Sequence, residues 1–212
     1  MIDADHRLRV ARGIAKSEKQ ASYQVFKTLQ RRGHPHAPPA TISDGWGGIE
    51  EAMLEFYGQV PPYIGHGRPI TTRRPLNDWK YIKMVKLTDQ DRRFLGVDIQ
   101  VIYGDPVETL ALLGKSTAYI ERTHLTMRHF NSRLNRKTLA FSKSLTMHKA
   151  AAAWEDLYYN LAKPHKSLRQ KATENSRRRW IKRTPAMAAG LAEHIWTVKD
   201  LLYFIPLPSG NS

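Results

Sequence analysis

The amino-acid sequence predicts an α/β protein whose mixed sheet is flanked by helices, and three observations support this fold class. Short segments with alternating apolar residues are interspersed along the chain with segments of helical periodicity. The 212 residues suffice for one domain with a sizeable core plus an appendage. A hydrophobic fraction of 41% is compatible with a folded core.

The first segments predict a crossover unit of strand, helix and loop. Apolar residues alternate over residues 7–15, which predicts a half-buried strand. Ser17 is a typical N-cap, so we expect a helix that runs to about Arg32 and stops at Gly33. The sequence GHPHAPP then predicts a stiff loop.

A second strand is predicted over residues 40–43, with Asp44 at its carboxyl end. Open α/β sheets place functional residues where a loop leaves a strand, which makes Asp44 a candidate. The alternative is that Asp44 supports the following Asp-Gly turn through its side chain. A helix is expected over about 49–57, and we interpret its three glutamates as a solvated face.

Residues 58–104 are expected to form an excursion that ends in an antiparallel hairpin. Residues 58–78 are rich in Gly, Pro and Arg, and their cations could contact phosphates or belong to a loosely packed loop. The alternating segments 79–87 and 96–104 predict the two strands of the hairpin. A short helix follows and stops at Gly114.

The segment Tyr119–Arg128 predicts a helix that carries Glu121 inside an otherwise basic stretch running to Lys143. Glu121 lies beside an apolar stripe, with a cation two turns further along. The alternative is a surface glutamate without a function. The apolar stripe consists of Ile120, Met127, Phe130 and Leu134. The adjoining side of the helix consists of Glu121, His124, Arg128 and Asn135.

The remaining chain predicts a long helix, a basic arm and two short helices. The long helix should begin near Ser144 and end around Ala162, before Pro164. Residues 163–183 contain nine Lys and Arg against one Glu, which predicts a phosphate-seeking arm or linker; the alternative is a linker whose charge serves only solubility. The short helices are expected after Thr184 and over residues 197–204.

The overall charge narrows the class of partner. A net charge of +15 and a pI near 10.1 favour polyanions, nucleic acid first, with an anionic membrane surface as the competitor. The absence of cysteine excludes disulfides and thiolate chemistry and fits a reducing cytosol. No stretch approaches the roughly 18–20 apolar residues of a membrane span, and the N-terminus lacks the apolar core of a signal peptide.

Asp44 and Glu121 stand out as acids by position. Two converging carboxylates can hold magnesium, a hard ion that prefers oxygen ligands, and two such ions stabilise the attacking and leaving oxygens of a phosphoryl displacement. Arg128 would neutralise a substrate phosphate nearby. Spacing alone does not decide whether the two acids converge. A zinc site built on His34, His36 and His66 is a further alternative, but no Cys supports it.

An ordered series of motifs resembles the transposases of small bacterial insertion sequences, specifically the family of short two-frame elements whose catalytic part uses an Asp-Asp-Glu triad. The resemblance covers residues 44–169 through motifs and residues 8–32 by layout. The motifs are SDGW at 43–46, YIERTHLTMR at 119–128, RLNRKTLAFSKS at 133–144 and the Tyr-Asn…Pro-His-x-Ser-Leu tail YYNLAKPHKSLR at 158–169.

The resemblance implies a ribonuclease H-like mixed sheet that lacks its first strands, with a hairpin excursion and a helical basic C-terminal extension. It implies a partial catalytic domain over 1–165, a DNA-contacting arm over 166–183 and a helical segment over 184–206. The family's second Asp maps onto Asp44 and its Glu onto Glu121. The basic residue seven positions after that Glu, which contacts DNA in the family, maps onto Arg128.

The family's first Asp lies on an opening strand for which this chain has no counterpart. Asp3 and Asp5 are poor substitutes, because they lie on a terminus expected to fray. An N-terminal part encoded in an upstream frame, or a decayed copy of the gene, would account for the difference. The excursion between Asp44 and Glu121 is also longer than in the smallest family members.

The function expected from the resemblance is DNA strand cleavage and strand transfer that depends on Mg²⁺ or Mn²⁺. The partners would be element ends and target DNA, bound by a homo-oligomer in a synaptic complex in the bacterial cytoplasm, at the nucleoid and not at a membrane. Two alternatives are a non-catalytic DNA-binding fragment that competes with full-length transposase, and an interaction module for RNA or acidic partners. The expected DNA contacts are Arg122, His124, Arg128, Arg133, Arg136, Lys137, Lys143, His165, Lys166, Arg177, Arg178 and Arg179.

Overall fold

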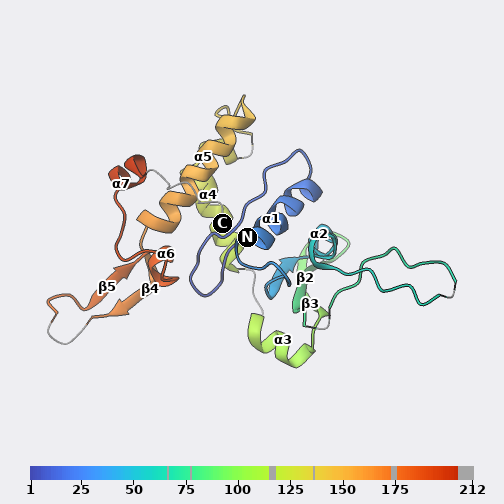
Figure 1. Ribbon diagram of the computed structural model, residues 1–212. Helices are drawn as coiled ribbons and strands as arrows, with labels where there is room; N and C mark the ends of the chain where they lie inside the picture. The colour runs from blue at the N-terminus through green and yellow to red at the C-terminus, as the bar shows by residue number, and fades with distance from the viewer. Residues whose placement is uncertain (66, 77, 115–117, 136, 173–175, 205–212) are drawn as a thin grey trace. The chain divides into compact units, whose positions relative to one another are not determined.

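The computed structural model describes residues 1–65, 67–76, 78–114, 118–135, 137–172 and 176–204 (Figure 1). The chain divides into two compact units. Unit 1 consists of Met1 and Val10–Glu121, and unit 2 consists of Ile2–Arg9 and the chain from Arg122 onward. The helix that carries Glu121 therefore contains the boundary between the two units.

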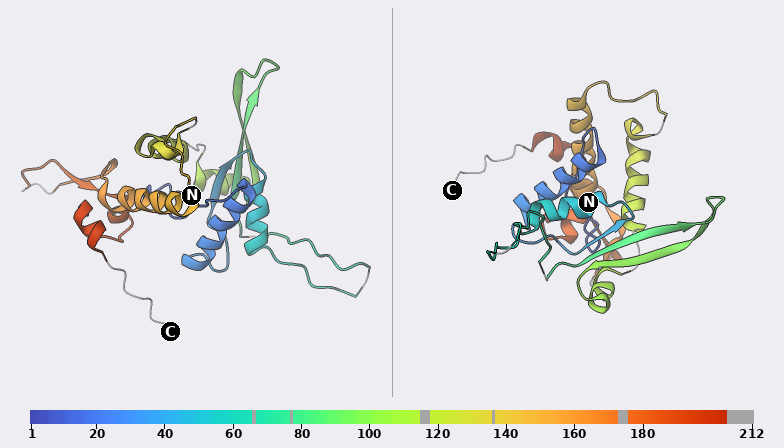
Figure 2. Two further views of the ribbon diagram at one scale, coloured as in Figure 1. Left: turned by 90° about the horizontal axis from the view of Figure 1, so that it is seen from above. Right: turned by 90° about the vertical axis from the view of Figure 1, so that its right-hand side faces the viewer.

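Unit 1 contains a three-stranded mixed sheet in the order β1-β2-β3. β1 (Thr41–Asp44) runs parallel to β2 (Tyr81–Thr88), which pairs antiparallel with β3 (Phe94–Tyr103). The predicted mixed sheet and the predicted hairpin are both confirmed. β2 and β3 form a long twisted ribbon, and the loop between α2 and β2 extends away from the sheet (Figure 2).

Two of the three helices α1, α2 and α3 begin at a residue whose side chain caps the first turn. α1 (Glu18–Arg32) starts at Ser17, whose Oγ accepts a hydrogen bond from the Gln20 backbone. α2 spans Gly48–Tyr57 and supplies the crossover between the parallel strands β1 and β2. α3 (Pro106–Leu113) starts at Asp105, whose carboxylate accepts hydrogen bonds from two backbone N–H groups of the first turn.

Aromatic side chains form the core of unit 1. Phe26 of α1, Tyr57 of α2 and Trp79 are almost completely buried, and their rings meet edge to face in series. Glu50 of α2 accepts hydrogen bonds from Lys83 and from the Tyr103 hydroxyl. The prediction of a fully solvated acidic face on α2 was therefore wrong for Glu50.

The predicted strand over residues 7–15 is not formed. This segment makes only an isolated bridge between Ile2 and Arg9. The physical reason is that the backbone of Arg9 is hydrogen-bonded by a side chain: its N–H donates to Asn160 Oδ1 and its C=O accepts from Asn160 Nδ2, each at 3.0 Å. The predicted crossover unit consequently lacks its strand, and Val10 and Ala11 instead pack against the hydrophobic core of unit 1.

Unit 2 is built on helices with one small sheet. α4 (Ala118–Phe130) is followed by a short helix η1 (Ser132–Leu134), so Leu134 and Asn135 do not continue the helical sides predicted from Glu121. α5 (Leu145–Leu157) leads into a π-helical turn η2 (Tyr158–Ala162), which confirms the predicted long helix. The predicted terminal helices are α6 (Pro185–Ala188) and α7 (Val198–Tyr203).

The basic arm contains a β-hairpin that the sequence analysis did not predict. β4 (His165–Lys171) pairs antiparallel with β5 (Trp180–Arg183). The strands are dominated by exposed cations rather than by alternating apolar residues, and for this reason hydrophobic periodicity gave no signal.

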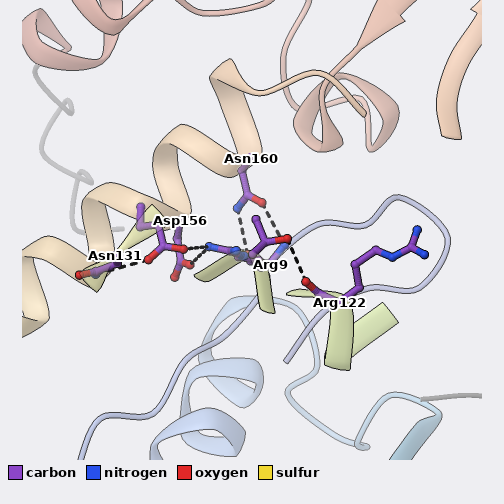
Figure 3. A network of polar contacts seen from close by, with 7 residues as sticks. Arg9, Arg122, Asn131, Asp156 and Asn160 are labelled. Atoms are coloured by element: carbon purple, nitrogen blue, oxygen red, sulfur yellow. Dashed lines mark hydrogen bonds and ion pairs between the residues drawn. The ribbon is translucent and has the colours of Figure 1, made fainter. Parts of the chain in front are cut away.

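A buried ion cluster around Arg9 holds unit 2 together (Figure 3). Arg9 Nη1 lies 3.1 Å from Glu155 Oε1 and 3.1 Å from Asp156 Oδ1, both on α5. The guanidinium also stacks on Tyr159, at 3.9 Å from the ring centroid. Only 5% of the Arg9 side chain and 9% of the Glu155 side chain is exposed, so these charges interact with little screening by water.

The same cluster connects three further parts of unit 2. Asn131, at the end of α4, donates a hydrogen bond to Glu155 Oε2. Asn160 of the π-helical turn holds the backbone of Arg9, and Tyr159 meets His165 of β4 edge to face. The N-terminal segment, α4, α5 and β4 are therefore linked through one arginine and its partners.

We predict that Arg9→Met strongly destabilises unit 2. Methionine keeps the apolar stem but leaves the buried Glu155 carboxylate without its cation, which typically costs about 3–5 kcal/mol. Hydrogen exchange of the α5 amides would measure the loss. Lys27→Met, at an exposed position of α1, is the matched control and should change nothing beyond about 0.5 kcal/mol. Unchanged protection of α5 in Arg9→Met would contradict the prediction.

Candidate active site and nucleic-acid interface

Asp44 is the last residue of β1 and its side chain is exposed. Its Oδ1 accepts a long hydrogen bond of 3.4 Å from the Trp46 backbone, which is the contact expected if Asp44 supports the turn. A bond of that length is weak and leaves most of the carboxylate's hydrogen-bonding capacity unused. The strand-end position is therefore compatible with both interpretations of Asp44.

The strand register assigns Asp44 to one face of the sheet. Asp44 pairs with Met84 across the parallel β1–β2 ladder, and Lys86 lies two residues further along β2. Because side chains alternate along a strand, Asp44, Met84 and Lys86 share a face. Ser43 lies on the opposite face, where its hydroxyl is 2.8 Å from that of Tyr81.

Glu121 reaches this same face from the first turn of α4. Its Oε1 lies 3.4 Å from Nζ of Lys86. Both side chains are more than half exposed, 60% for Glu121 and 69% for Lys86, so the pair is weak and a stronger ligand can displace it. Binding of the Asp44 and Glu121 carboxylates to one pair of metal ions stays a prediction. Both residues nevertheless contact β2, Asp44 through the strand pairing and Glu121 through Lys86.

Lys86 is a residue that sequence reasoning missed. The available signal was the spacing Lys80, Lys83 and Lys86 in the predicted strand, since the first and last of these share a face while Lys83 points away. Lys80 pairs with Glu108 of α3 at 3.2 Å, which repeats on that face the pairing between Lys86 and Glu121.

The donor chemistry of this face suits a hard divalent cation. Asp44 and Glu121 offer carboxylate oxygens, and magnesium in nucleic-acid enzymes is usually bound by one or two carboxylates together with substrate phosphates and water. Among the described residues, no three His, Cys, Asp or Glu side chains gather to hold a metal ion. The two acids therefore fit such an ion only with substrate oxygens as further ligands.

The exposed side of α4 continues from Glu121 to His124 and Arg128. His124 and Arg128 follow Glu121 by three and seven residues on the helix, and all three side chains are exposed. Thr123 is buried on the other side and hydrogen-bonds Tyr159. Arg128 thus shares its side of α4 with Glu121, as its spacing predicted, and Arg122 is exposed beside it.

The other predicted DNA contacts differ in their surroundings. Arg133 donates a hydrogen bond to Ser142, and Lys137 and Lys143 are exposed in the loop before α5. In the basic arm, Lys166 of β4 and Arg177, Arg178 and Arg179 before β5 are exposed. Arg136 lies outside the described residues, as does His66 of the alternative zinc site.

His165 is the predicted DNA contact with the least exposed ring. It packs edge to face on Tyr159 at 4.7 Å between ring centroids, and its Nε2 is buried without a hydrogen-bond partner in the described part of the chain. Burial, together with the charges of Lys163 and Arg9, lowers the pKa of His165 to about 4. Its neutral ring therefore has a packing role, and the exposed cations are better placed to contact phosphates.

Comparison with known families matches residues 83–155 to the family model described as IS1 transposase. The matched segment resembles an IS1 transposase. It covers about a third of the chain, from β2 to α5, and contains Lys86 and all of α4 with Glu121. Asp44 and the hairpin β4–β5 lie outside it.

The IS1 transposase match supports the resemblance to the Asp-Asp-Glu transposases of small insertion sequences, a family that uses divalent metal ions and acts on DNA. It begins inside β2, so the second half of the predicted excursion belongs to the matched segment. No curated protein and no solved structure matches the chain. None of the helices in the described ranges is long and apolar enough to cross a membrane.

We predict that His165 makes the stability of unit 2 depend on pH. The unfolded chain binds a proton at His165 with a pKa near 6.5, whereas the folded protein does so only near 4, so folding is penalised progressively as the pH falls from about 6.5 to 4. His165→Phe removes this titration and keeps the aromatic contact with Tyr159. Thermal unfolding measured across this range should show the variant losing less stability than the parent.

The matched control is His34→Phe, at an exposed histidine in the loop after α1, which should leave the pH dependence of the parent unchanged. Parallel pH profiles for His165→Phe and the parent would mean that His165 is protonated at the same pH in the folded and unfolded states.

Proposed function

We propose that the chain carries out transposase-like cleavage and transfer of DNA strands at the face of β1 and β2 that bears Asp44. The observation that carries this proposal is the position of Glu121: its carboxylate contacts Lys86 on that face, and both residues lie in the segment similar to an IS1 transposase. Mg²⁺ or Mn²⁺ bound by Asp44, Glu121 and phosphate oxygens would activate the nucleophile and neutralise charge on the phosphate.

The proposed reaction has two displacements at phosphorus. In the first, the oxygen of water forms a bond to phosphorus and the bond to the 3′-oxygen breaks, which leaves a 3′-hydroxyl and a 5′-phosphate. In the second, this 3′-hydroxyl attacks a phosphodiester of the target strand and releases a new 3′-hydroxyl there. Each step consumes one proton-bearing nucleophile and returns one hydroxyl, so no further co-reactant is needed.

The residues of the chain have separate tasks in this proposal. Lys86 holds the Glu121 carboxylate over β2 and must release it when the carboxylate takes up a cation; the exposed ion pair allows this because it is weak. Arg128, on the same side of α4, would bind the phosphate that flanks the cleaved bond. The cations of the basic arm would hold the DNA backbone.

We predict that Glu121→Gln and Asp44→Asn each abolish cleavage while DNA binding persists. The amide keeps the shape of the side chain but removes the negative charge that binds the metal ion, a loss worth about 100-fold or more in rate. The measurement is nicking of supercoiled plasmid and of a duplex taken from the DNA that flanks the coding sequence, with Mg²⁺ or Mn²⁺.

Glu108→Gln is the matched control, because Glu108 also pairs with a lysine, Lys80 directly before β2, but has no proposed role in catalysis. Its cleavage rate should equal that of the parent. Equal rates for the parent and Glu121→Gln would rule out a catalytic Glu121.

A second candidate function is a non-catalytic DNA-binding protein that competes with full-length transposase. The observation in its favour is that no group of three or more His, Cys, Asp or Glu side chains among the described residues could hold a metal ion. This candidate requires DNA binding but no nicking activity by the parent chain under the same conditions, so the cleavage assay separates the two functions.

We predict that the basic arm supplies affinity that does not depend on DNA sequence. Arg177, Arg178 and Arg179 are exposed, and each phosphate contact lowers the slope of log K against log salt by about 0.9. Replacing all three with Ala should therefore make this negative slope shallower by up to roughly 3 on two unrelated duplexes alike, because phosphate contacts do not read bases. Binding titrations across a salt series measure this change.

The control removes the same charge from another place. Lys16, Lys27 and Arg31 are exposed in or beside α1, and their replacement with Ala should change the slope much less than the arm variant does. A slope that stays at the parent's value in the arm variant would show that the arm makes no phosphate contact, and a loss on only one duplex would show that it reads bases.

A further inference from the structure

The hairpin of β4 and β5 presents the indole of Trp180 among cations. Trp180 pairs with Lys171 across the ladder, and Gln170 pairs with Ile181. Side-chain alternation puts Arg169 on the face of Lys171 and Lys182 on the face of Trp180, so this face carries three exposed cations around one half-buried indole. Gln170 and Ile181 occupy the opposite face.

The indole of Trp180 is covered by a side chain that can leave. The Arg169 guanidinium lies 4.1 Å from the ring centroid, and that of Arg179 lies 6.0 Å from it. Because Arg169 is exposed, water competes for its guanidinium and the cation–π contact with the half-buried ring is weak. The stacking of a nucleic-acid base on an aromatic side chain is stronger, and it does not depend on which base is present.

The two cations beside Trp180 are arranged to follow a sugar-phosphate backbone. Lys171 lies across the ladder from the indole and Lys182 two residues along β5, both exposed. When a base replaces Arg169 on the ring, the released guanidinium stays within side-chain reach of the phosphate of that nucleotide. Binding of the nucleotide therefore breaks the cation–π contact of Arg169 with Trp180 and forms a stacking contact with the base and an ion pair with the phosphate.

We propose that this face of the hairpin binds an unpaired nucleotide of DNA, with Trp180 stacked on the base and Arg169, Lys171 and Lys182 on the backbone. The bases of an intact duplex are stacked on one another and are not available to Trp180, so the face prefers single-stranded or frayed DNA ends. This inference rests on DNA being the partner in the proposed function, and it adds recognition of unpaired nucleotides, which cleavage at a strand end would expose.

The test compares the full chain with Trp180→Leu and Trp180→Phe on two probes. The probes are a blunt duplex and the same duplex with a short single-stranded overhang. We expect Trp180→Leu to weaken binding of the overhang probe by about tenfold while binding of the blunt probe stays unchanged, and Trp180→Phe to restore most of the loss. Ile181→Ala, on the opposite face of the hairpin, is the control and should bind both probes as the parent does.

A second measurement uses only the parent chain. A fluorescent adenine analogue in the overhang should be quenched on binding by stacking on the indole, whereas the same analogue inside the duplex should not change. An equal loss on both probes in Trp180→Leu, no loss on the overhang probe, or no quenching would each overturn the inference and leave the proposed cleavage unaffected. A parent chain that binds neither probe would overturn the inference together with the DNA partner itself.

Discussion

Arg9 is the residue on which the organisation of unit 2 depends. The buried hydrophobic side chains of this unit are few, namely Ala152, Tyr159, Ala186 and Leu201 among the described residues. A charged cluster therefore provides part of the stabilisation that an apolar core provides in other proteins. Such a cluster is specific but sensitive, because removal of one partner leaves a buried charge uncompensated. The segment Ile2–Arg9 is thus an integral part of a unit whose other residues follow Glu121 in the sequence.

This cluster also contains residues of the Tyr-Asn…Pro-His segment 158–169, whose motif resembles the tail of insertion-sequence transposases. Tyr159 stacks on Arg9 and meets His165, while Asn160 holds the Arg9 backbone. The π-helical turn allows neighbouring residues to point at one target, because the extra residue per turn changes the direction of successive side chains. These motif residues therefore act through packing and hydrogen bonding inside unit 2.

The candidate catalytic face carries the acids Asp44 and Glu121, whereas the basic hairpin carries cations. On each of them, a side chain of interest is held by a weak contact that is exposed to water. Glu121 is paired with Lys86, and Trp180 is covered by Arg169. Exposed pairs of this kind contribute little to stability, so substrate groups can replace them at low cost. Both surfaces would therefore change partners on binding DNA without any disturbance of the buried cores.

The sequence by itself determined the parts of this protein that depend on local chemistry. The ends of α1, α3 and α7 follow from Ser17, Asp105 and Thr197, whose side chains satisfy the first backbone N–H groups of each helix. The hairpin of β2 and β3 follows from alternation, and the motif around Glu121 predicted the family resemblance. These features need no information from distant residues.

Only the tertiary structure decided the features that depend on long-range contacts. Residues 7–15 alternate like a strand, but Asn160, far along the chain, takes the backbone hydrogen bonds of Arg9 that a strand partner would need. The contact of Glu121 with Lys86, and the pairing of charged strands β4 and β5, likewise join residues whose attraction leaves no periodic pattern in the sequence. Periodicity reports which side of an element is apolar, and it does not report which polar group lies opposite.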